Sequence, residues 1–177
     1  MFRFLRTLTS LCIIGIILYA VLSIRPYRVD GDSMMPTLKP ESIAIIDRIS
    51  PKISPLHRGE IIVYRSGFEG IKIKRVIGLP GELLQINDGG VSLLIDNIQN
   101  PLEERYLEEH TRTCVPGACT ELGIQLYSVP ENHYFVLGDN RINSRDSRGC
   151  IDVADCKNKQ PIYIPSDEII GRVIFSW

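Results

Sequence analysis

The sequence carries almost no net charge and has no repeated or biased segments. Its 20 lysines and arginines are offset by 21 aspartates and glutamates, which leaves a net charge of −1 over 177 residues. This balance argues against a nucleic-acid binder of the usual basic kind. A disordered chain is excluded because 44% of the residues are hydrophobic. With no internal repeat and no low-complexity tract, one compact domain with at most a modest insertion is expected.

Only one long stretch lacks charged residues, and it lies near the N-terminus. No charged residue occurs from Thr7 to Ile24, and about 18 residues at 1.5 Å each form a helix of about 27 Å, enough to cross a hydrocarbon core of ~30 Å. A cleavable signal peptide is the alternative, since Arg3 and Arg6 could form its basic start. No A-x-A cleavage motif precedes Arg25, however, which argues against the signal peptide. A buried core helix would need a polar face, and this stretch has almost none. We therefore expect a transmembrane anchor within residues 1–27.

The five cysteines favour disulfides, which in turn indicate that the body of the protein lies outside the cytoplasm. Cys12 lies inside the expected anchor, whereas the other four form two short-range pairs in the loop-like sequences CVPGAC and CIDVADC. We predict the disulfides Cys114–Cys119 and Cys150–Cys156, since the four and five intervening residues are more than the two that are common in zinc sites. Disulfides persist outside the cytoplasm. The expected topology is therefore single-pass in the cell membrane, with a cytoplasmic N-terminus and the body on the extracytoplasmic face.

The chain after the anchor has the pattern of a β protein. Short β-branched runs between Pro, Gly and Ser turns are typical of antiparallel strands. They occur at Ser42–Asp47, Glu60–Arg65, Ile71–Gly78, Leu83–Asp88, Val91–Asp96, His133–Asp139 and Gly171–Trp177. The sequence NDGG at Asn87–Gly90 predicts a hairpin turn, and Asn100–Thr111 fits a helix or a solvated loop equally well. We expect a mostly β fold, an antiparallel β-sheet domain over residues 28–177 with a small β-rich insertion at about 83–127.

Ser33 is the candidate nucleophile. It lies in VDGDSMMPTLKP, Val29–Pro40, a few residues beyond the expected anchor. Taken alone, Gly-Asp-Ser is ordinary turn chemistry, and a serine nucleophile needs a base that takes its proton. The three histidines, His57, His110 and His133, have no suggestive sequence context. A Ser-His-Asp triad is defined in space, so this alternative stays open.

Lysine is the other candidate base. In IKIKRVIGLPGE, Lys72 and Lys74 alternate with isoleucines on a predicted strand, where a solvated face is the ordinary expectation. A lysine in an apolar setting instead has a lowered pKa and supplies a neutral amine near pH 7. The segment Leu137–Gly149 is dense in Asp, Asn, Ser and Arg, and forms either a polar loop or a hydrogen-bonded platform for a catalytic group. The residues alone do not choose between the two lysines.

Taken in this order, the segments resemble the type I signal peptidases, the membrane-anchored Ser/Lys proteases of protein export. The matching sequences are GDSMMPTL at Gly31–Leu38, GEIIVYR at Gly59–Arg65, KRVIGLPGE at Lys74–Glu82, GDNRINSRDSR at Gly138–Arg148 and IIGRVIFSW at Ile169–Trp177. They cover most of the body outside the expected insertion and follow the expected anchor.

The resemblance implies roles for single residues. Ser33 matches the family nucleophile, and Lys74 matches its general base. Supporting residues are implied as well: Ser144 to orient the lysine amine, and Asp139, Asp146 and Arg148 to brace the site. The pockets for the substrate side chains at positions −1 and −3 are implied to be lined by four apolar residues, Val29, Met34, Leu38 and Ile73.

The implied activity is removal of N-terminal signal peptides from exported preproteins after a small-x-small motif, without a metal or other cofactor and without nucleic acid. The substrate is implied to add as an extended strand, and the lipid bilayer and nearby export machinery are the implied partners. Gly31 stands where some relatives have a serine that donates to the oxyanion, and Ile142 stands where an aspartate is usual. A specialised peptidase with the same dyad, a self-cleaving Ser/Lys repressor and an inactive binding module are the alternative functions.

Overall fold

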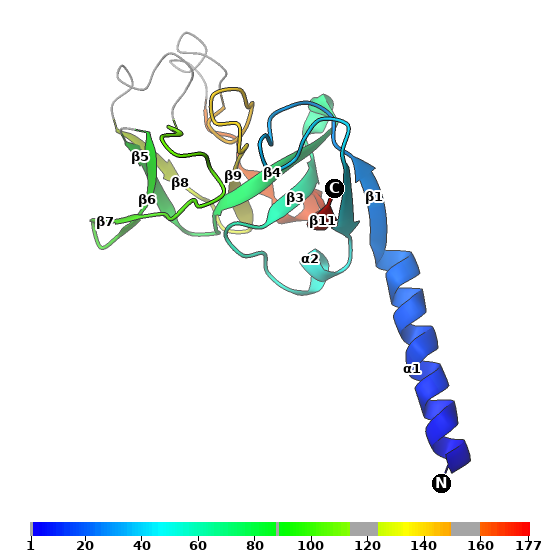
Figure 1. Ribbon diagram of the computed structural model, residues 1–177. Coiled ribbons are helices and arrows are strands. Elements are labelled where there is room, and N and C mark those ends of the chain that lie inside the picture. Colours follow the sequence, from blue (N-terminus) through cyan, green and yellow to red (C-terminus); the bar gives the residue numbers. More distant parts are fainter. Residues whose placement is uncertain (1, 88, 114–123, 150–159) are drawn as a thin grey trace.

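A long apolar helix leads into a body made of two antiparallel sheets. The computed structural model describes residues 2–87, 89–113, 124–149 and 160–177 (Figure 1). Helix α1, Phe2–Ser23, projects from the body, and the second sheet lies on the side of the body opposite the helix (Figure 1). The expected fold class, mostly β behind one N-terminal apolar helix, is confirmed.

The body contains short strands and little helix. The strands are β1 (Ile24–Arg28), β2 (Ile43–Asp47), β3 (Ile61–Arg65), β4 (Ile71–Gly78), β5 (Leu83–Asn87), β6 (Gly90–Ile95), β7 (Ile98–Pro101), β8 (Gln125–Ser128), β9 (His133–Leu137), β10 (Ile164–Pro165) and β11 (Ile169–Ser176). Helix α2 covers Ser50–Ile53, and two 3₁₀ turns cover Gly67–Glu69 and Ser166–Glu168.

The larger sheet has the strand order β1-β2-β11-β3-β4-β9-β10, so the C-terminal strand lies between two strands from the first half of the body. All of its pairings are antiparallel. The strand β4 is almost entirely buried from Ile73 to Gly78, because it lies near the middle of this sheet. This placement carries residues of β4, including two charged ones, into the interior.

The second sheet has the order β7-β6-β5-β8 and comes from the stretch that the sequence sets apart as an insertion. The predicted hairpin at NDGG is confirmed, since Asn87 pairs with Gly90 where β5 turns into β6. The segment Asn100–Thr111, for which a helix and a loop were both open, completes β7 and then runs through turns. Leu84 and Ile86 of β5 pack in one buried apolar cluster with Phe135 of β9, which joins the two sheets.

Helix α1 runs directly into the larger sheet, without a linker. The carbonyl of Ser23 accepts a hydrogen bond from the Arg48 backbone N–H at 3.0 Å, and Ile24 pairs with Asp47 at the start of β1. From Phe4 onward, α1 is long and apolar enough to cross a membrane by length and composition, and its apolar side chains are exposed. The end of this helix is therefore fixed to the edge of the sheet that contains β4.

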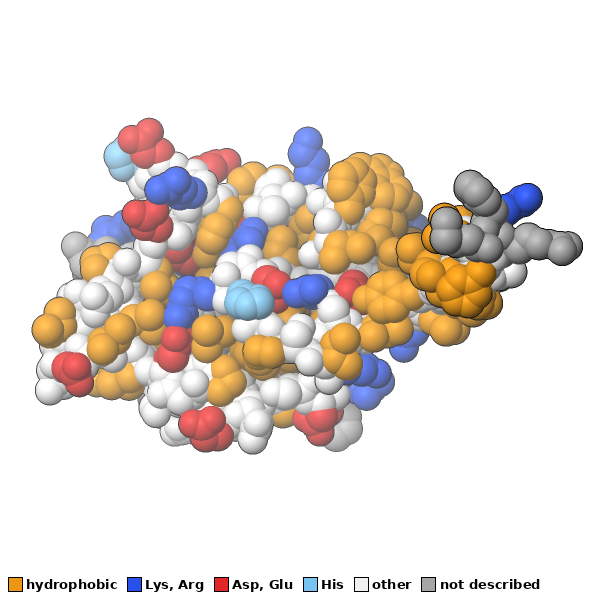
Figure 2. All heavy atoms as spheres, turned by 90° about the horizontal axis from the view of Figure 1, so that it is seen from below, with side chains coloured by type: hydrophobic (Ala, Val, Ile, Leu, Met, Phe, Trp, Pro, Cys, Tyr) orange, Lys and Arg blue, Asp and Glu red, His pale blue; other side chains and the backbone are white. Residues whose placement is uncertain are grey.

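Apolar and charged side chains are distributed differently over helix and body. Apolar side chains dominate the visible surface of α1, whereas acidic and basic side chains are scattered among apolar and uncharged ones over the visible face of the body (Figure 2). Cys12 lies exposed on α1 as a free cysteine. The predicted disulfides Cys114–Cys119 and Cys150–Cys156 lie outside the described residues, so they stay predictions.

Candidate active site

Ser33 lies in the turn that connects β1 to β2, and a second loop holds this turn in place. The Asn140 backbone N–H donates to the Ser33 carbonyl at 3.0 Å, and the Asn143 side chain donates to the Asp32 carboxylate at 2.9 Å. Gly31 has a φ of +80°, a conformation that favours glycine over residues with a side chain. The half-buried Ser33 side chain thus lies on a turn that hydrogen bonds from the loop after β9 hold in place.

Lys74 reaches Ser33 from β4. Its Nζ donates to Ser33 Oγ at 2.5 Å and to the carbonyl of Ile73 at 3.0 Å, and the residue is only 4% exposed. Lys72 lies two residues earlier on the same face of the strand, but its ammonium group forms an ion pair with Glu69. The structure therefore brings Lys74, and not Lys72, into hydrogen-bond contact with the candidate nucleophile.

Burial lowers the pKa of Lys74 from 10.5 to about 8. Desolvation of the ammonium group is the largest cause, because an ion loses its hydration in the interior. Nearby charges act in both directions: Asp146 and Asp139 raise this pKa, whereas Lys72 and Arg148 lower it. A pKa of about 8 leaves roughly one amine in ten neutral at pH 7, which is enough for a base.

Two aspartates close to Lys74 are each paired with an arginine. Asp146 accepts from Arg148 through both carboxylate oxygens at 2.8 Å, and Asp139 accepts from Arg75 at 2.9 and 2.6 Å. Burial alone would raise the pKa of Asp146, but the charge and hydrogen bonds of Arg148 outweigh it and lower the pKa. Both carboxylates therefore belong to buried pairs with arginine.

Gly138 brings the candidate supporting serine close to the nucleophile. Its N–H donates to the Asp146 carboxylate at 3.0 Å, and a Cβ on Gly138 would overlap both the Ser144 side chain and the Ser33 carbonyl. Ser144 is 4% exposed, and its side chain lies close enough to Asp146 to help lower the pKa of that carboxyl. Ser144 thus lies in the interior between the Ser33 turn and Asp146.

A buried charge cluster links the second sheet to this loop, and the sequence analysis did not single it out. The Arg141 guanidinium is fully buried, donates to the Gly138 carbonyl at 3.0 Å and pairs with Glu104 through both of its terminal nitrogens. The ring of Tyr106 lies 3.8 Å from the Arg75 guanidinium. Glu104 and Tyr106 belong to the segment after β7, where a run of charged residues gives no local sign of burial.

The four apolar residues expected to line substrate pockets lie together in the core. Val29, Met34, Leu38 and Ile73 belong to one buried cluster and expose at most 4% of their surface. The structure therefore brings them together next to the Ser33 turn as packed core side chains. Their contact with a substrate stays a prediction.

None of the three histidines contacts Ser33. The Nδ1 atom of His57 lies 3.6 Å from Glu60 Oε1, and the Nε2 atom of His110 lies 3.9 Å from Glu109 Oε1. The ring of His133 forms a hydrogen bond with the Glu131 carbonyl. The side chains of His57 and His110 are three-quarters or more exposed. This placement favours lysine over histidine as the partner of Ser33.

A serine held against a buried lysine, on a β scaffold, is typical of a hydrolase that uses a serine nucleophile, and comparison with known proteins gives the family. The chain matches the family "Signal peptidase, peptidase S26" over residues 1–177. It is similar to signal peptidase I U of Bacillus subtilis, with 34% identity over 81% of this chain and 79% of the relative. It is also similar to signal peptidase I of Bacillus caldolyticus, with 34% identity over 95% of this chain and 86% of the relative.

A crystal structure of a signal peptidase I from Enterococcus faecalis also matches, with 27% identity over 67% of this chain and 97% of that chain, at a TM-score of 0.43. The family match over residues 1–177 and the identities to the two Bacillus relatives establish the family of this chain. The chain belongs to the signal peptidase family, peptidase S26, and is a serine peptidase that acts in signal peptide removal.

Removing the carboxylate of Glu104 is expected to destabilise the protein strongly, because it leaves the Arg141 charge buried and unpaired. Glu104→Ala should lower the free energy of unfolding by about 3 kcal/mol. Glu103→Ala is the matched control: its carboxylate is 76% exposed and pairs with exposed Arg105, so it should change stability by less than about 1 kcal/mol. Denaturant unfolding of the full chain in detergent measures both values, and equal values would refute the bracing role of Glu104.

Proposed function

We propose that this peptidase is a membrane-anchored endopeptidase that removes signal peptides after a small-x-small motif with a Ser33–Lys74 dyad. The observation that carries the proposal is the 2.5 Å hydrogen bond between a lysine amine that is 4% exposed and the hydroxyl of Ser33. A buried amine is a base near neutral pH, and a serine needs a base within hydrogen-bond distance. The signal peptide of a preprotein is the substrate.

The two residues divide the proton transfers between them. Neutral Lys74 takes the Ser33 proton while Oγ attacks the scissile carbonyl carbon, and the oxyanion forms near the Ser33 backbone N–H. The resulting ammonium then protonates the departing amine, which leaves an acyl ester on Ser33. Lys74 next takes a proton from water, whose oxygen attacks the ester carbonyl carbon. The ammonium then returns this proton to Ser33 Oγ as the ester bond breaks, so the signal peptide leaves with a new carboxyl group and both residues regain their starting states. Ser144 is the positioning residue for the amine during these steps, since its buried hydroxyl lies beside Ser33.

One edge of β4 is open to an extended substrate. The strand β9 pairs with β4 only from Arg75 onward, where Arg75 lies opposite Leu137. On the other side, β3 pairs with β4 along its whole first half, from Ile71 to Arg75. Among the strands described, none pairs with the second edge of Ile71–Lys74, so a peptide can add there by main-chain hydrogen bonds.

The preference for small side chains follows from this mode of binding. Side chains −1 and −3 of an extended peptide point to the same side, which is toward the apolar cluster of Val29, Met34, Leu38 and Ile73 when the peptide lies beside Ile73. That cluster is already closely packed. Only small side chains such as alanine fit against it without displacing core residues.

Helix α1 is the proposed membrane anchor, with the N-terminus in the cytoplasm and the body outside. Its 22 residues span about 33 Å at 1.5 Å per residue, compared with ~30 Å of hydrocarbon. The direct junction at Ser23 holds the body at the membrane surface. Enzyme and membrane-bound preprotein then share one surface, next to the export machinery, which raises their effective concentration.

Ser33→Ala is expected to abolish cleavage and leave the fold intact, because it removes one half-buried hydroxyl, which bonds Lys74. Cleavage of a fluorogenic Ala-x-Ala peptide by the full chain in detergent should fall by a factor of about 10³ or more. The matched control is Ser42→Ala, whose hydroxyl bonds the Lys39 carbonyl away from the dyad. Turnover by Ser33→Ala at the control's rate would refute the assignment.

The pH dependence of activity should follow Lys74. The neutral amine is the active form, so kcat/KM should rise about tenfold per pH unit below pH 7, reach half of its plateau near pH 8 and level off about one pH unit higher. Lys74→Arg should be inactive because a guanidinium stays protonated in this range.

Lys72→Arg is the control and should keep most activity, since arginine preserves the charge that helps to lower the pKa of Lys74. Loss in the Lys72 variant with survival of the Lys74 variant would show that the base is Lys72. A limb near pH 6.5 that disappears in His57→Ala, His110→Ala or His133→Ala would show that the base is a histidine.

A further inference from the structure

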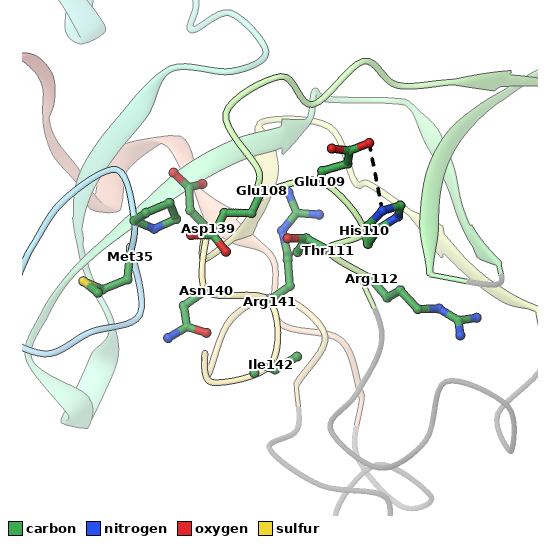
Figure 3. A pocket seen from close by; sticks show the side chains of 11 residues that line it. Met35, Glu108, Glu109, His110, Thr111, Arg112, Asp139, Asn140, Arg141 and Ile142 are labelled. Carbon is green, nitrogen blue, oxygen red and sulfur yellow. Dashed lines mark ion pairs between the residues drawn. The ribbon is translucent and has the colours of Figure 1, made fainter.

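A pocket of about 560 Å³ opens beside the Ser33 turn, and the proposed mechanism does not use it. Three segments line it: Met35–Pro36, which follows Ser33, Glu108–Arg112 from the loop after β7, and Asp139–Ile142 from the loop after β9 (Figure 3). Met35 and Ile142 lie on separate segments, on different sides of Asn140 (Figure 3). The pocket is therefore formed jointly by the nucleophile turn, the insertion and the loop that carries the supporting residues.

The accessible surface of this pocket is more apolar than polar, although exposed charged residues of the segment Glu108–Arg112 line one side of it. Ile142 is 66% exposed within the sequence DNRINSRD, and Met35 is 37% exposed next to Pro36. The charged groups of Asp139 and Arg141 are buried: Asp139 forms an ion pair with Arg75, and Arg141 forms one with Glu104. An apolar side chain placed between Met35 and Ile142 would remove both from water.

The pocket lies close to Ser33, because chain connection and hydrogen bonds join its walls to the Ser33 turn. Met35 lies two residues after Ser33, and Asn140 donates from its backbone to the Ser33 carbonyl and from its side chain to the Asp32 carbonyl, at 3.0 and 3.2 Å. An extended peptide advances about 3.3 Å per residue. The first three residues on one side of the scissile bond, about 10 Å of chain, are therefore the ones within reach of this pocket.

The direction in which the substrate runs along β4 decides which side of the scissile bond reaches the pocket. The edge of β4 is open from Ile71 to Lys74, and it is occupied by β9 from Arg75 onward. If the signal peptide lies along the open edge, the chain beyond the scissile bond meets Leu137 and Gly138 and has to leave the sheet. The wall Asp139–Ile142 continues directly from that point. The segment that reaches the pocket is therefore the start of the mature protein.

We infer that this pocket binds a large apolar side chain from the first three residues of the mature segment. The inference rests on the proposed function, because it needs a peptide with its scissile bond at Ser33. It makes Ile142 a specificity-determining residue on the mature side of the cleavage site, independent of the small-x-small requirement on the signal-peptide side.

Paired peptides test this inference on the full chain in detergent. A fluorogenic Ala-x-Ala substrate carries leucine or aspartate at each of the first three positions after the scissile bond. At one position, the wild type should cleave the leucine peptide about tenfold better in kcat/KM than the aspartate peptide. Ile142→Asp should bring this ratio close to one, and Ile142→Ala should lower it about threefold.

Ile98→Asp is the matched control, because Ile98 is 65% exposed and lies on β7, at the edge of the second sheet. It should leave the wild-type ratio unchanged. Ratios within twofold of one at all three positions in the wild type would overturn the inference, as would equal ratios in Ile142→Asp and Ile98→Asp. If the wild type cleaves none of the peptides, the proposed function itself fails, and this outcome is distinct from cleavage without a preference.

Discussion

The amine of Lys74 is held where water hardly reaches it, and the carboxylates that could stabilise its ammonium form are already bound elsewhere. Asp146 gives both oxygens to Arg148, and Asp139 gives both to Arg75. Each aspartate therefore acts on Lys74 mainly as half of a neutral pair, and desolvation prevails. A pKa of about 8 in place of 10.5 disfavours the charged amine by about 3 kcal/mol.

The rest of the fold supports this arrangement. The strand β4 places Lys74 in the interior, β9 pairs with β4 only from Arg75 onward, and the loop after β9 holds the Ser33 turn through Asn140. Glu104, in the segment after β7, neutralises Arg141, which in turn donates to the Gly138 carbonyl. The second sheet and its loops therefore contribute to the geometry around Ser33 and Lys74 although they lie outside the matched sequence segments.

Local sequence patterns predicted much of the fold and only part of the site. The alternation of β-branched residues located β2, β3, β4 and β9, and NDGG located the hairpin, because these signals depend on neighbours in sequence. The edge strand β1, with its proline and two arginines, was not predicted. Residue patterns also left Lys72 and Lys74 equivalent, since they share one face of one strand, and only the resemblance to the family separated them. What separates them in space is the contact with Ser33, 41 residues earlier in the chain.

The buried role of Glu104 was missed for the same reason. In EERYLEEH it is one of four glutamates, and nothing local distinguishes it from exposed Glu103. Its burial depends on Arg141, 37 residues further along the chain. The charge pairs around Lys74 are likewise set by loops that meet only in the folded protein.

The most direct test of the account is the titration of Lys74 itself. The ¹³Cε resonance of this lysine, assigned by comparing the full chain in detergent with Lys74→Arg, can be followed from pH 6 to pH 11 by NMR. The account predicts a midpoint near pH 8. A midpoint near 10.5, the value of an unperturbed lysine, would mean that the amine is charged at neutral pH, and would contradict its role as the base.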